Sequence, residues 1–402
     1  MAHPDHRSLG RRLRMFTTED LCGTGLPLWL PAGATIRAEL EQYVVELERR
    51  NGYQHVYTPQ LAKRELYDQS GHWEHFHGDM YPPMQIGREQ FVLRPMNCPH
   101  HILVFRSERR HIRDLPWRLA ELGTMFRNER SGVVGGLSRV RQMTLNDGHV
   151  FCTPDQLESE TVRILTMVHE AYRALRIPAP GYRLSLPDDD PKFVRNDDMW
   201  RRSEAALRST LDGMALPYEE ARGEAAFYGP KIDLQVHDPQ GREETLSTVQ
   251  VDFHLPARFQ LVAFDGDRRV QPVMVHRSIV STMERMVAHL LEVHDGALPV
   301  WLSPCQIRIL PVVDAAIDYS FEVQARCRAA GLRADVDHRD STLGARVRDA
   351  RRDHVPFIAV VGQREVDGST VAVRLREDRR LDVVRIDEFV ALVLRVAQTR
   401  EG

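Results

Sequence analysis

Apolar residues recur at helical spacing in three parts of the chain. Residues 34–51 carry apolar side chains at positions 36, 40, 43, 44 and 47, and Asn51-Gly52 ends that pattern. Residues 153–175 begin with Thr153 as an N-cap and Pro154 at the first helical position. The third stripe consists of Ile279, Met283, Met286 and Leu290, with Arg285 off it. We therefore predict three amphipathic helices.

Other segments of the first three quarters are typical of strands. Residues 54–59, 90–95, 115–130 and 138–151 are rich in β-forming residues, and several of them alternate apolar with polar positions. The segment "SGVVGGLS", between the last two, is glycine-rich and predicts a loop. These patterns predict a hairpin with a long, mobile connection.

The tail alternates strand and helix. Strand patterns occupy 306–313, 333–339, 357–362 and 370–377, and helical patterns occupy 314–330, 341–354 and 386–398. This alternation predicts a small α/β unit with a parallel or mixed sheet. The proline-bearing "LPVWLSPCQ" marks the boundary, so we expect an α+β domain at 1–302 and an α/β domain at 303–402.

Composition narrows the class of protein. The chain has 402 residues, 42% of them hydrophobic, which suits two or three globular domains. No apolar run approaches the roughly 18 residues that cross a bilayer, and the N-terminus lacks a secretory signal. The five cysteines are scattered, which favours a reducing compartment. We expect a cytoplasmic protein without a membrane partner.

Arginine supplies almost all of the positive charge. Only three of the 54 basic residues are lysine, and genome composition explains this bias most simply. Arginine also binds phosphates in a bidentate manner, so phosphate-bearing partners fit the sequence. Lys231, at the start of a predicted strand after Gly229-Pro230, stands out in this background.

The segment "RPMNCPHH" raises the question of a metal site. Cysteine and histidine are the usual zinc ligands, but cysteine is also among the residues most often buried for structural reasons. Two more candidate ligands, His149 and His276, come from distant segments. Cys98, His149 and His276 would form a zinc site with open positions, although their spacing alone leaves the structural alternative open.

Further polar residues could handle anions and amines. Arg127 and Glu129 would share one face of a strand, where they could bind an anion and a ring nitrogen, or simply form an ion pair. Asp147 lies two residues from His149 and could bind an ammonium group. No glycine-rich phosphate loop of the common types occurs, so ATP would need a sheet surface and arginines.

These motifs together resemble the threonyl-tRNA synthetase family, within the class II aminoacyl-tRNA synthetases. The resemblance runs from about residue 9 to the end. It rests on "GYQHVYTPQL…SGHW" as motif 1, "RPMNCPHH" as the zinc-cysteine segment, "MFRNERSG…LSRVRQMTLNDGHVFCT" as motif 2 and "VMVHRSIVSTMER" as motif 3. The tail resembles the family's anticodon-binding domain.

The resemblance implies a threonine–tRNA ligase that forms threonyl-adenylate from ATP and L-threonine and charges tRNA(Thr). It implies Zn²⁺ on Cys98, His149 and His276, reading the amino and hydroxyl groups of threonine, and Mg²⁺ accompanying ATP. It also implies a homodimer formed through the motif 1 region around Pro59. The implied threonine-binding residues are Met96, Asp147, Tyr228 and Arg127.

The remaining implied roles concern ATP, transfer and the anticodon. The ATP-binding residues are Arg127, Glu129, Arg139, Met143, Gln250 and Arg285. The catalytic residues are Arg127, Arg285, His72 and Lys231, with His72 helping to deprotonate the tRNA ribose. Glu365 and Arg374 would read anticodon bases.

Several positions depart from the family pattern. Met143 stands where some members have an adenine-stacking phenylalanine, and Leu145 and Thr245 replace frequent glutamines. Asp340 and Thr342 stand in the tail where an amide and a lysine are common, which would weaken RNA binding there.

The N-terminal editing domains of full-length bacterial members have no counterpart in the sequence, so we expect a form without cis editing. The alternatives are a synthetase-like enzyme that activates threonine or an analogue for a non-tRNA acceptor, an antibiotic-resistant duplicate, and a catalytically silent paralogue.

Overall fold

The computed structural model describes residues 5–400. Its largest sheet has the strand order β11-β10-β12-β13-β16-β9-β8-β3. Neighbouring strands are antiparallel except at the two edges, where β10 pairs with β11 and β8 with β3 in parallel. The strands are β3 (Gln54–His55), β8 (Trp117–Phe126), β9 (Gln142–Cys152), β10 (Gly181–Leu186), β11 (Tyr218–Arg222), β12 (Lys231–His237), β13 (Glu243–Asp252) and β16 (Val273–Ser278).

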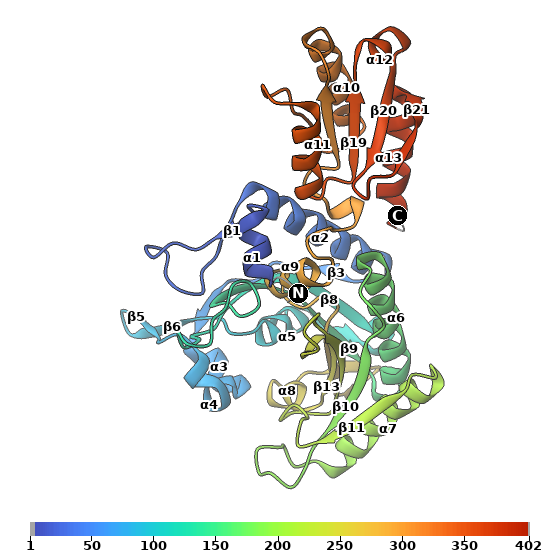
Figure 1. Cartoon of the computed structure of the whole chain (residues 1–402). Coiled ribbons are helices and arrows are strands. Elements are labelled where there is room, and N and C mark those ends of the chain that lie inside the picture. The colour runs from blue at the N-terminus through green and yellow to red at the C-terminus, as the bar shows by residue number, and fades with distance from the viewer. Residues whose placement is uncertain (1–4, 401–402) are drawn as a thin grey trace.

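The three predicted helices form and bury their apolar stripes against this sheet. They are α2 (Pro31–Arg50), α6 (Leu157–Leu175) and α9 (Met283–Val293). Figure 1 shows α6 and α7 (Asp197–Gly213) along one side of the sheet and α2 and α9 close to the tail domain. Ile279 is fully buried but precedes α9, in the turn after β16. The capping motif at Thr153 opens a short 3₁₀ turn, Pro154–Gln156, before α6 begins.

Several strand predictions were too long. The strand predicted at 54–59 is paired only over β3, and β8 ends at Phe126, so Arg127 and Glu129 lie after the strand and not on it. The hairpin of β8 and β9 is confirmed, with Phe126 opposite Gln142. The Arg127 N–H still donates to Arg141 O at 2.9 Å, one position beyond the last strand pair, Phe126 and Gln142.

Smaller elements surround the sheet. β4, β5 and β6 form a small antiparallel sheet that projects from the body with α3 and α4 (Figure 1). The strands are β1 (Phe16–Thr17), β2 (Leu28–Trp29), β4 (Leu61–Lys63), β5 (Met84–Ile86), β6 (Glu89–Leu93), β7 (Arg110–His111), β14 (Ala263–Asp265) and β15 (Arg268–Val270). The helices are α1 (His6–Arg12), α3 (Arg64–Ser70), α4 (His72–Phe76), α5 (Cys98–Arg106) and α8 (His254–Arg258).

The tail forms a five-stranded mixed sheet in the order β18-β17-β19-β20-β21. β17, β18 and β19 are parallel, and β20 and β21 run antiparallel to their neighbours. The elements are β17 (Ile307–Pro311), α10 (Ile317–Ala329), β18 (Ala334–Val336), α11 (Leu343–Arg352), β19 (Phe357–Val361), α12 (Gln363–Gly368), β20 (Thr370–Leu375), β21 (Arg380–Arg385) and α13 (Ile386–Thr399).

The structure confirms the predicted fold class, an α+β domain followed by a small α/β unit. Trp301 and Leu302 belong to the larger hydrophobic core, whereas Val300 and Ile307 belong to the core of the tail. Polar contacts join the two parts, including an ion pair between Arg333 and Glu39 at 2.5 Å. Within the described residues, no helix is both long and apolar enough to cross a membrane.

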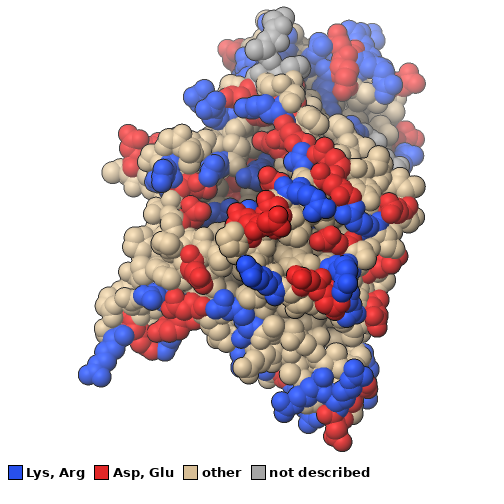
Figure 2. Space-filling view, turned by 90° about the horizontal axis from the view of Figure 1, so that it is seen from below, with Lys and Arg blue, Asp and Glu red and all other residues tan. Residues whose placement is uncertain are grey.

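Charged side chains of both signs are interspersed over the face of the molecule that Figure 2 shows. This mixture agrees with the small formal net charge of −3.

Candidate functional site

The central strands β9, β13 and β16 line a cavity of about 280 Å³. Most of the residues predicted to bind threonine, ATP or the metal line it together: Met96, Cys98, Arg127, Met143, Asp147, Tyr228, Gln250, His276 and Arg285. Further lining residues come from the same strands, among them Leu145, Thr245, Thr248, Arg277 and Ser278. The cavity therefore has a Cys/His end and an arginine end, joined by the floor of the sheet.

Three elements bring the predicted metal ligands together at one end. Cys98 is the first residue of α5, His149 lies in β9, and His276 lies in β16 directly opposite His149. All three are buried, and their ligand atoms lie within 4.8 Å of one another. Because the two histidines occupy paired positions, the register of two strands fixes one edge of the cluster.

A chain of buried hydrogen bonds holds the histidines from outside the cluster. His276 Nε2 lies 2.8 Å from Asp252 Oδ2, and His149 Nδ1 lies 2.8 Å from His101 Nδ1. His101 Nε2 in turn lies 3.2 Å from Glu121 Oε2. Carboxylates accept hydrogen bonds, so Asp252 and Glu121 each assign a ring proton to the histidine that faces them.

These assignments leave two nitrogens facing each other. With neutral rings, His101 accepts from His149 Nδ1–H, so His149 Nε2 and His276 Nδ1 carry lone pairs only 2.9 Å apart. Two lone pairs at that distance repel unless a cation lies between or beside them, either a proton or a metal ion. One thiol and two imidazoles directed at one point are a donor set that suits zinc, so the residues present fit the metal.

The electrostatics of the cluster point the same way. Burial raises the pKa of the Cys98 thiol well above its ordinary value, and the negative charges of Asp147 and Asp252 raise it further. Burial, together with His276 and His101, lowers the pKa of His149 well below its ordinary value. A divalent ion would supply the positive charge that a buried thiolate needs.

Asp147 and Tyr228 lie beside the Cys/His cluster. Burial raises the pKa of Asp147, although the nearby histidines and Arg277 oppose the shift. Tyr228 stacks on His276 with ring centroids 5.0 Å apart, and its hydroxyl donates to Gln250 Oε1 at 2.5 Å. A carboxylate and an aromatic wall next to the Cys/His cluster make a small polar subsite, with Met96 at its border.

The other end of the cavity carries two arginines without counter-ions. In the part of the chain that the structure describes, neither Arg127 nor Arg285 has a carboxylate oxygen within 4.0 Å. Burial, and then the charge of Arg285, lowers the pKa of Arg127. Two partly buried positive groups that repel each other form a site for an anion, and guanidinium groups suit phosphate oxygens.

The other predicted ATP residues lie around this end. Glu129 and Arg139 form an ion pair at 2.8 Å. An ion pair is the simpler of the two roles that the sequence allows for Glu129, the other being a contact with a ligand. Met143 and Gln250 line the cavity, and Gln250 also donates to Thr248. Lys231 begins β12 opposite Gln250, but its ammonium group binds Asp233 Oδ2 at 2.5 Å and does not line the cavity.

His72 lies outside the cavity lining. It is fully buried at the start of α4, with Nδ1 2.7 Å from Ser70 Oγ. Burial and the charge of His276 lower its pKa to about 3. The low pKa makes His72 neutral. Its Nε2 has no hydrogen-bond partner among residues 5–400 and can still accept or donate a hydrogen bond.

The remaining predicted residues lie elsewhere. Pro59 is exposed beside Tyr57, whose surface is 95% accessible, at the edge of the small β4–β6 sheet. Glu365 accepts from the Gly362 N–H at 2.8 Å and thereby caps α12. Arg374 lies on β20, opposite Ile358 of β19.

Sequence reasoning missed the supporting residues His101, Glu121 and Asp252. His101 is the last residue of the "RPMNCPHH" segment, but its partner His149 lies 48 residues away. Glu48 and Arg277 were also missed, although they form a fully buried ion pair at 2.6 Å and Arg277 belongs to the cavity lining. Only the pairing of strands shows which polar residues meet in the core.

Two family descriptions match the chain. Residues 83–294 match the tRNA synthetase class II core domain of the G, H, P, S and T type, and residues 306–395 match an anticodon binding domain. The chain is 48% identical over 394 residues to a threonine–tRNA ligase of Oceanobacillus iheyensis, covering 97% of this chain and 61% of that protein. It is 49% identical to the corresponding ligase of Listeria monocytogenes, covering 97% and 62%.

A solved structure agrees in fold. The structure described as the RNA binding domain of threonyl-tRNA synthetase from Cryptosporidium parvum superposes with a TM-score of 0.93 at 31% identity, covering 98% of both chains. The chain spans about 61% of the length of the bacterial relatives. On the matched core, the matched anticodon domain and this structural likeness, the chain belongs to the class II aminoacyl-tRNA synthetases, in the threonyl-tRNA synthetase family.

Proposed function

We propose that this protein activates L-threonine with ATP and transfers it to tRNA(Thr). The observation that carries the proposal is a single cavity with a Cys/His cluster at one end and two unneutralised arginines at the other. An amino acid at the first end and a nucleoside triphosphate at the second would meet with the carboxylate and the α-phosphorus adjacent. Holding two reactants in this way is the main source of rate in such reactions.

At the amino-acid end, Cys98, His149 and His276 would hold zinc, with Asp252 and His101 orienting the histidines. When bound, zinc would supply a Lewis-acid contact for the amino and hydroxyl groups of threonine. Asp147 would bind the ammonium group, and Tyr228 and Met96 would close the subsite. An apolar pocket separates threonine from valine poorly, whereas a site that requires a hydroxyl rejects valine strongly.

At the other end, Arg127 would hold the α-phosphate and the threonine carboxylate, and Arg285 would hold the outer phosphates together with Mg²⁺. The carboxylate attacks the α-phosphorus in line and pyrophosphate leaves, while the arginines stabilise the charge on the phosphoryl oxygens. Glu129, Met143 and Gln250 would contact the adenosine portion. Arg139 would break its ion pair with Glu129 and bind the γ-phosphate. Lys231 would stabilise the strands beneath the site.

In the second step, the 3′-terminal ribose hydroxyl of the tRNA attacks the adenylate carbonyl and AMP leaves. We assign to His72 a hydrogen bond from that hydroxyl to its unpaired Nε2. Its low pKa keeps the imidazole neutral at physiological pH, so Nε2 can accept a hydrogen bond from the hydroxyl. Glu365 and Arg374 would contact the anticodon, and a homodimer would form around Pro59. The two domains would divide at residues 302 and 303.

The experiment is ATP–pyrophosphate exchange with threonine and with valine, followed by charging of tRNA(Thr) with threonine and with serine. Both activities with threonine, together with exclusion of valine, are expected. Pyrophosphate exchange without any charging of tRNA would show that threonine is transferred to an acceptor other than tRNA. Absence of exchange with threonine and with its hydroxylated analogues would overturn the proposal.

A further inference from the structure

The loop between β8 and β9 is held at its tip by the N-terminal helix α1. The tip is a closed turn, in which Gly135 N–H donates to Arg139 O at 3.0 Å and Ser138 N–H donates to Gly135 O at 3.1 Å. Leu137, at the apex, is fully buried in the main core. A loop that carries ligand-binding arginines thus has an apolar anchor beneath α1.

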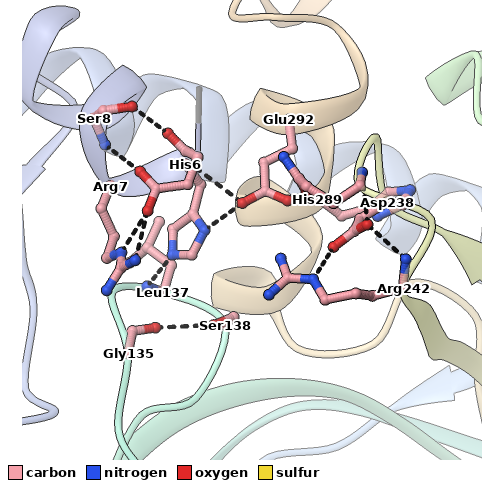
Figure 3. A network of polar contacts seen from close by, with 12 residues as sticks. His6, Arg7, Ser8, Gly135, Leu137, Ser138, Asp238, Arg242, His289 and Glu292 are labelled. Atoms are coloured by element: carbon pink, nitrogen blue, oxygen red, sulfur yellow. Dashed lines mark hydrogen bonds and ion pairs between the residues drawn. The ribbon is translucent and has the colours of Figure 1, made fainter. Parts of the chain in front are cut away.

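His6 makes the polar part of this anchor (Figure 3). The Leu137 N–H donates to His6 Nε2 at 3.2 Å, so Nε2 is unprotonated and the ring proton lies on Nδ1. That proton faces Glu292 Oε1 of α9 at 2.7 Å, and the backbone N–H of His6 donates to the same oxygen at 3.0 Å. One imidazole in one tautomer therefore joins the loop tip to α9.

Gly136 makes the close approach possible. Its φ of +52° favours glycine, and a Cβ at this position would lie 2.2 Å from His6 Nε2. His6 itself is only 6% exposed. The loop and α1 therefore pack closely here, and the contact depends on a glycine in the loop and a buried histidine in α1.

The same helix α9 reaches the loop a second time. Arg285 Nε donates to Ser138 O at 3.4 Å, one residue after the amide held by His6. Arg285 and Glu292 are seven residues apart, so they lie on one face of α9, separated by about 10 Å along its axis. α9 thus contacts two neighbouring residues of the loop, directly through Arg285 and indirectly through Glu292 and His6.

We propose that His6 is a positioning residue for ATP: it fixes the tip of the 131–141 loop against α9, so that Arg139 and Arg285 face the triphosphate. The proposal rests on the proposed function, since it assigns ATP to the arginine end of the cavity. His6 does not line that cavity and acts through the loop.

Two substitutions separate the contacts of His6. In His6→Gln, Oε1 reaches the place of Nε2 and can accept from the Leu137 N–H, but the contact with the Glu292 side chain is lost. In His6→Asn, the shorter amide can donate to Glu292 but cannot reach Leu137. Ser8→Ala is the matched control, because the hydroxyl of Ser8 bonds to Asp5 in the same segment and, within the described chain, contacts neither the loop nor Glu292.

Hydrogen exchange of the peptide 131–141 and the KM values of pyrophosphate exchange are the two measurements. His6→Asn should speed amide exchange in this peptide roughly tenfold, as expected for the loss of one buried hydrogen bond. It should also raise the KM for ATP severalfold and leave the KM for threonine and the zinc content unchanged. His6→Gln should restore both properties, and Ser8→Ala should change neither.

If His6→Asn fails to fold, Gly136→Ala tests the same contact, since its methyl group displaces His6, and the same two changes are expected. Unchanged exchange of the peptide in both variants would overturn the proposal, as would equal effects of His6→Gln and His6→Asn on the KM for ATP. If the unaltered chain catalyses no pyrophosphate exchange, the proposed function fails, whereas the hydrogen-exchange result still decides whether His6 holds the loop.

Discussion

His149 Nε2 lies 2.9 Å from His276 Nδ1, although 127 residues separate the two histidines in the chain. The antiparallel pairing of β9 and β16 places them opposite each other, and each ring is fixed by a buried polar partner on its far side. Cys98 completes the triangle from the first turn of α5. Strand pairing and buried hydrogen bonds therefore hold the histidines in place, an arrangement that favours tight and selective binding of an ion.

Cys98→Ala should abolish both zinc binding and threonine activation. The thiolate is the only negatively charged donor in the cluster, so its loss removes charge as well as a ligand. The measurements are metal analysis of the purified protein and threonine-dependent pyrophosphate exchange.

Cys152→Ala is the matched control, because Cys152 is a fully buried cysteine on β9 outside the cluster. It should reduce thermal stability and keep the zinc. Retention of zinc and activity by Cys98→Ala would remove the zinc assignment, whatever the control does.

His101→Ala should weaken zinc binding about 10- to 100-fold, the usual effect of removing a group that orients a metal-binding histidine. Without His101, the His149 ring loses the acceptor that fixes its Nδ1 proton. Competition with a chromophoric chelator measures the affinity directly. His100→Ala is the control, since the Nδ1 of the neighbouring His100 is buried and has no hydrogen-bond partner among residues 5–400. Equal affinities of the two variants would show that His101 does not orient the site.

The three amphipathic helices, the β8–β9 hairpin and the α/β tail could be predicted because each rests on a local pattern. α12 and β21 were missed for the opposite reason. α12 has only six residues, and β21 is mostly exposed with charged residues at Arg380, Asp382 and Arg385, so neither leaves a clear apolar period. The end of β8 was missed because the residues after Phe126 remain compatible with a strand.

For the site, the residues around Cys98, Arg127 and His276 could be assigned by resemblance, but their neighbours could not. His101, Glu121 and Asp252 lie on α5, β8 and β13, and only the folded sheet brings them to the ligands. The sequence alone does not show whether an isolated polar residue is buried against a partner or exposed to solvent. Strand register and packing therefore determine which residues hold the candidate ligands in place.

Arg127→Met should abolish pyrophosphate exchange and at the same time raise the thermal midpoint of the ligand-free protein. Arg127 lies partly buried near Arg285 with no carboxylate partner in the described chain, so its removal relieves repulsion while it removes a phosphate ligand. Such opposite effects on stability and activity would show that the repulsion between the two arginines lowers the stability of the ligand-free protein and is kept because the arginines bind phosphate. Differential scanning calorimetry and exchange assays measure the two quantities.

Arg183→Met is the control for this experiment. Arg183 binds Glu219 and Glu243 at the edge of the sheet, so its loss should lower the midpoint slightly and leave exchange intact. A lower midpoint in Arg127→Met would show that the pair of arginines is not mutually destabilising.

Glu48→Gln should lower the free energy of unfolding at pH 7 by about 3–5 kcal/mol, since it leaves Arg277 buried without its counter-charge. The Glu48 carboxylate lies 2.6 Å from Arg277 and also accepts from Asn146 at 2.7 Å. Burial raises the pKa of Glu48, but Arg277, His55 and Asn146 outweigh it and hold the pKa below its ordinary value of 4.5.

A lowered pKa in the folded state fixes the sign of the pH dependence. Below about pH 4.5 the unfolded chain binds a proton at this residue while the folded chain still resists it, so the free energy of unfolding falls as the pH falls through this range. Urea unfolding between pH 3 and 7 should show a steeper acid loss for the unaltered protein than for Glu48→Gln. Glu41→Gln, on the same helix but with a partly exposed ion pair to Arg37, should keep the full slope. Parallel curves for the unaltered protein and Glu48→Gln would mean that Glu48 is not the carboxylate that couples protonation to the unfolding of this core.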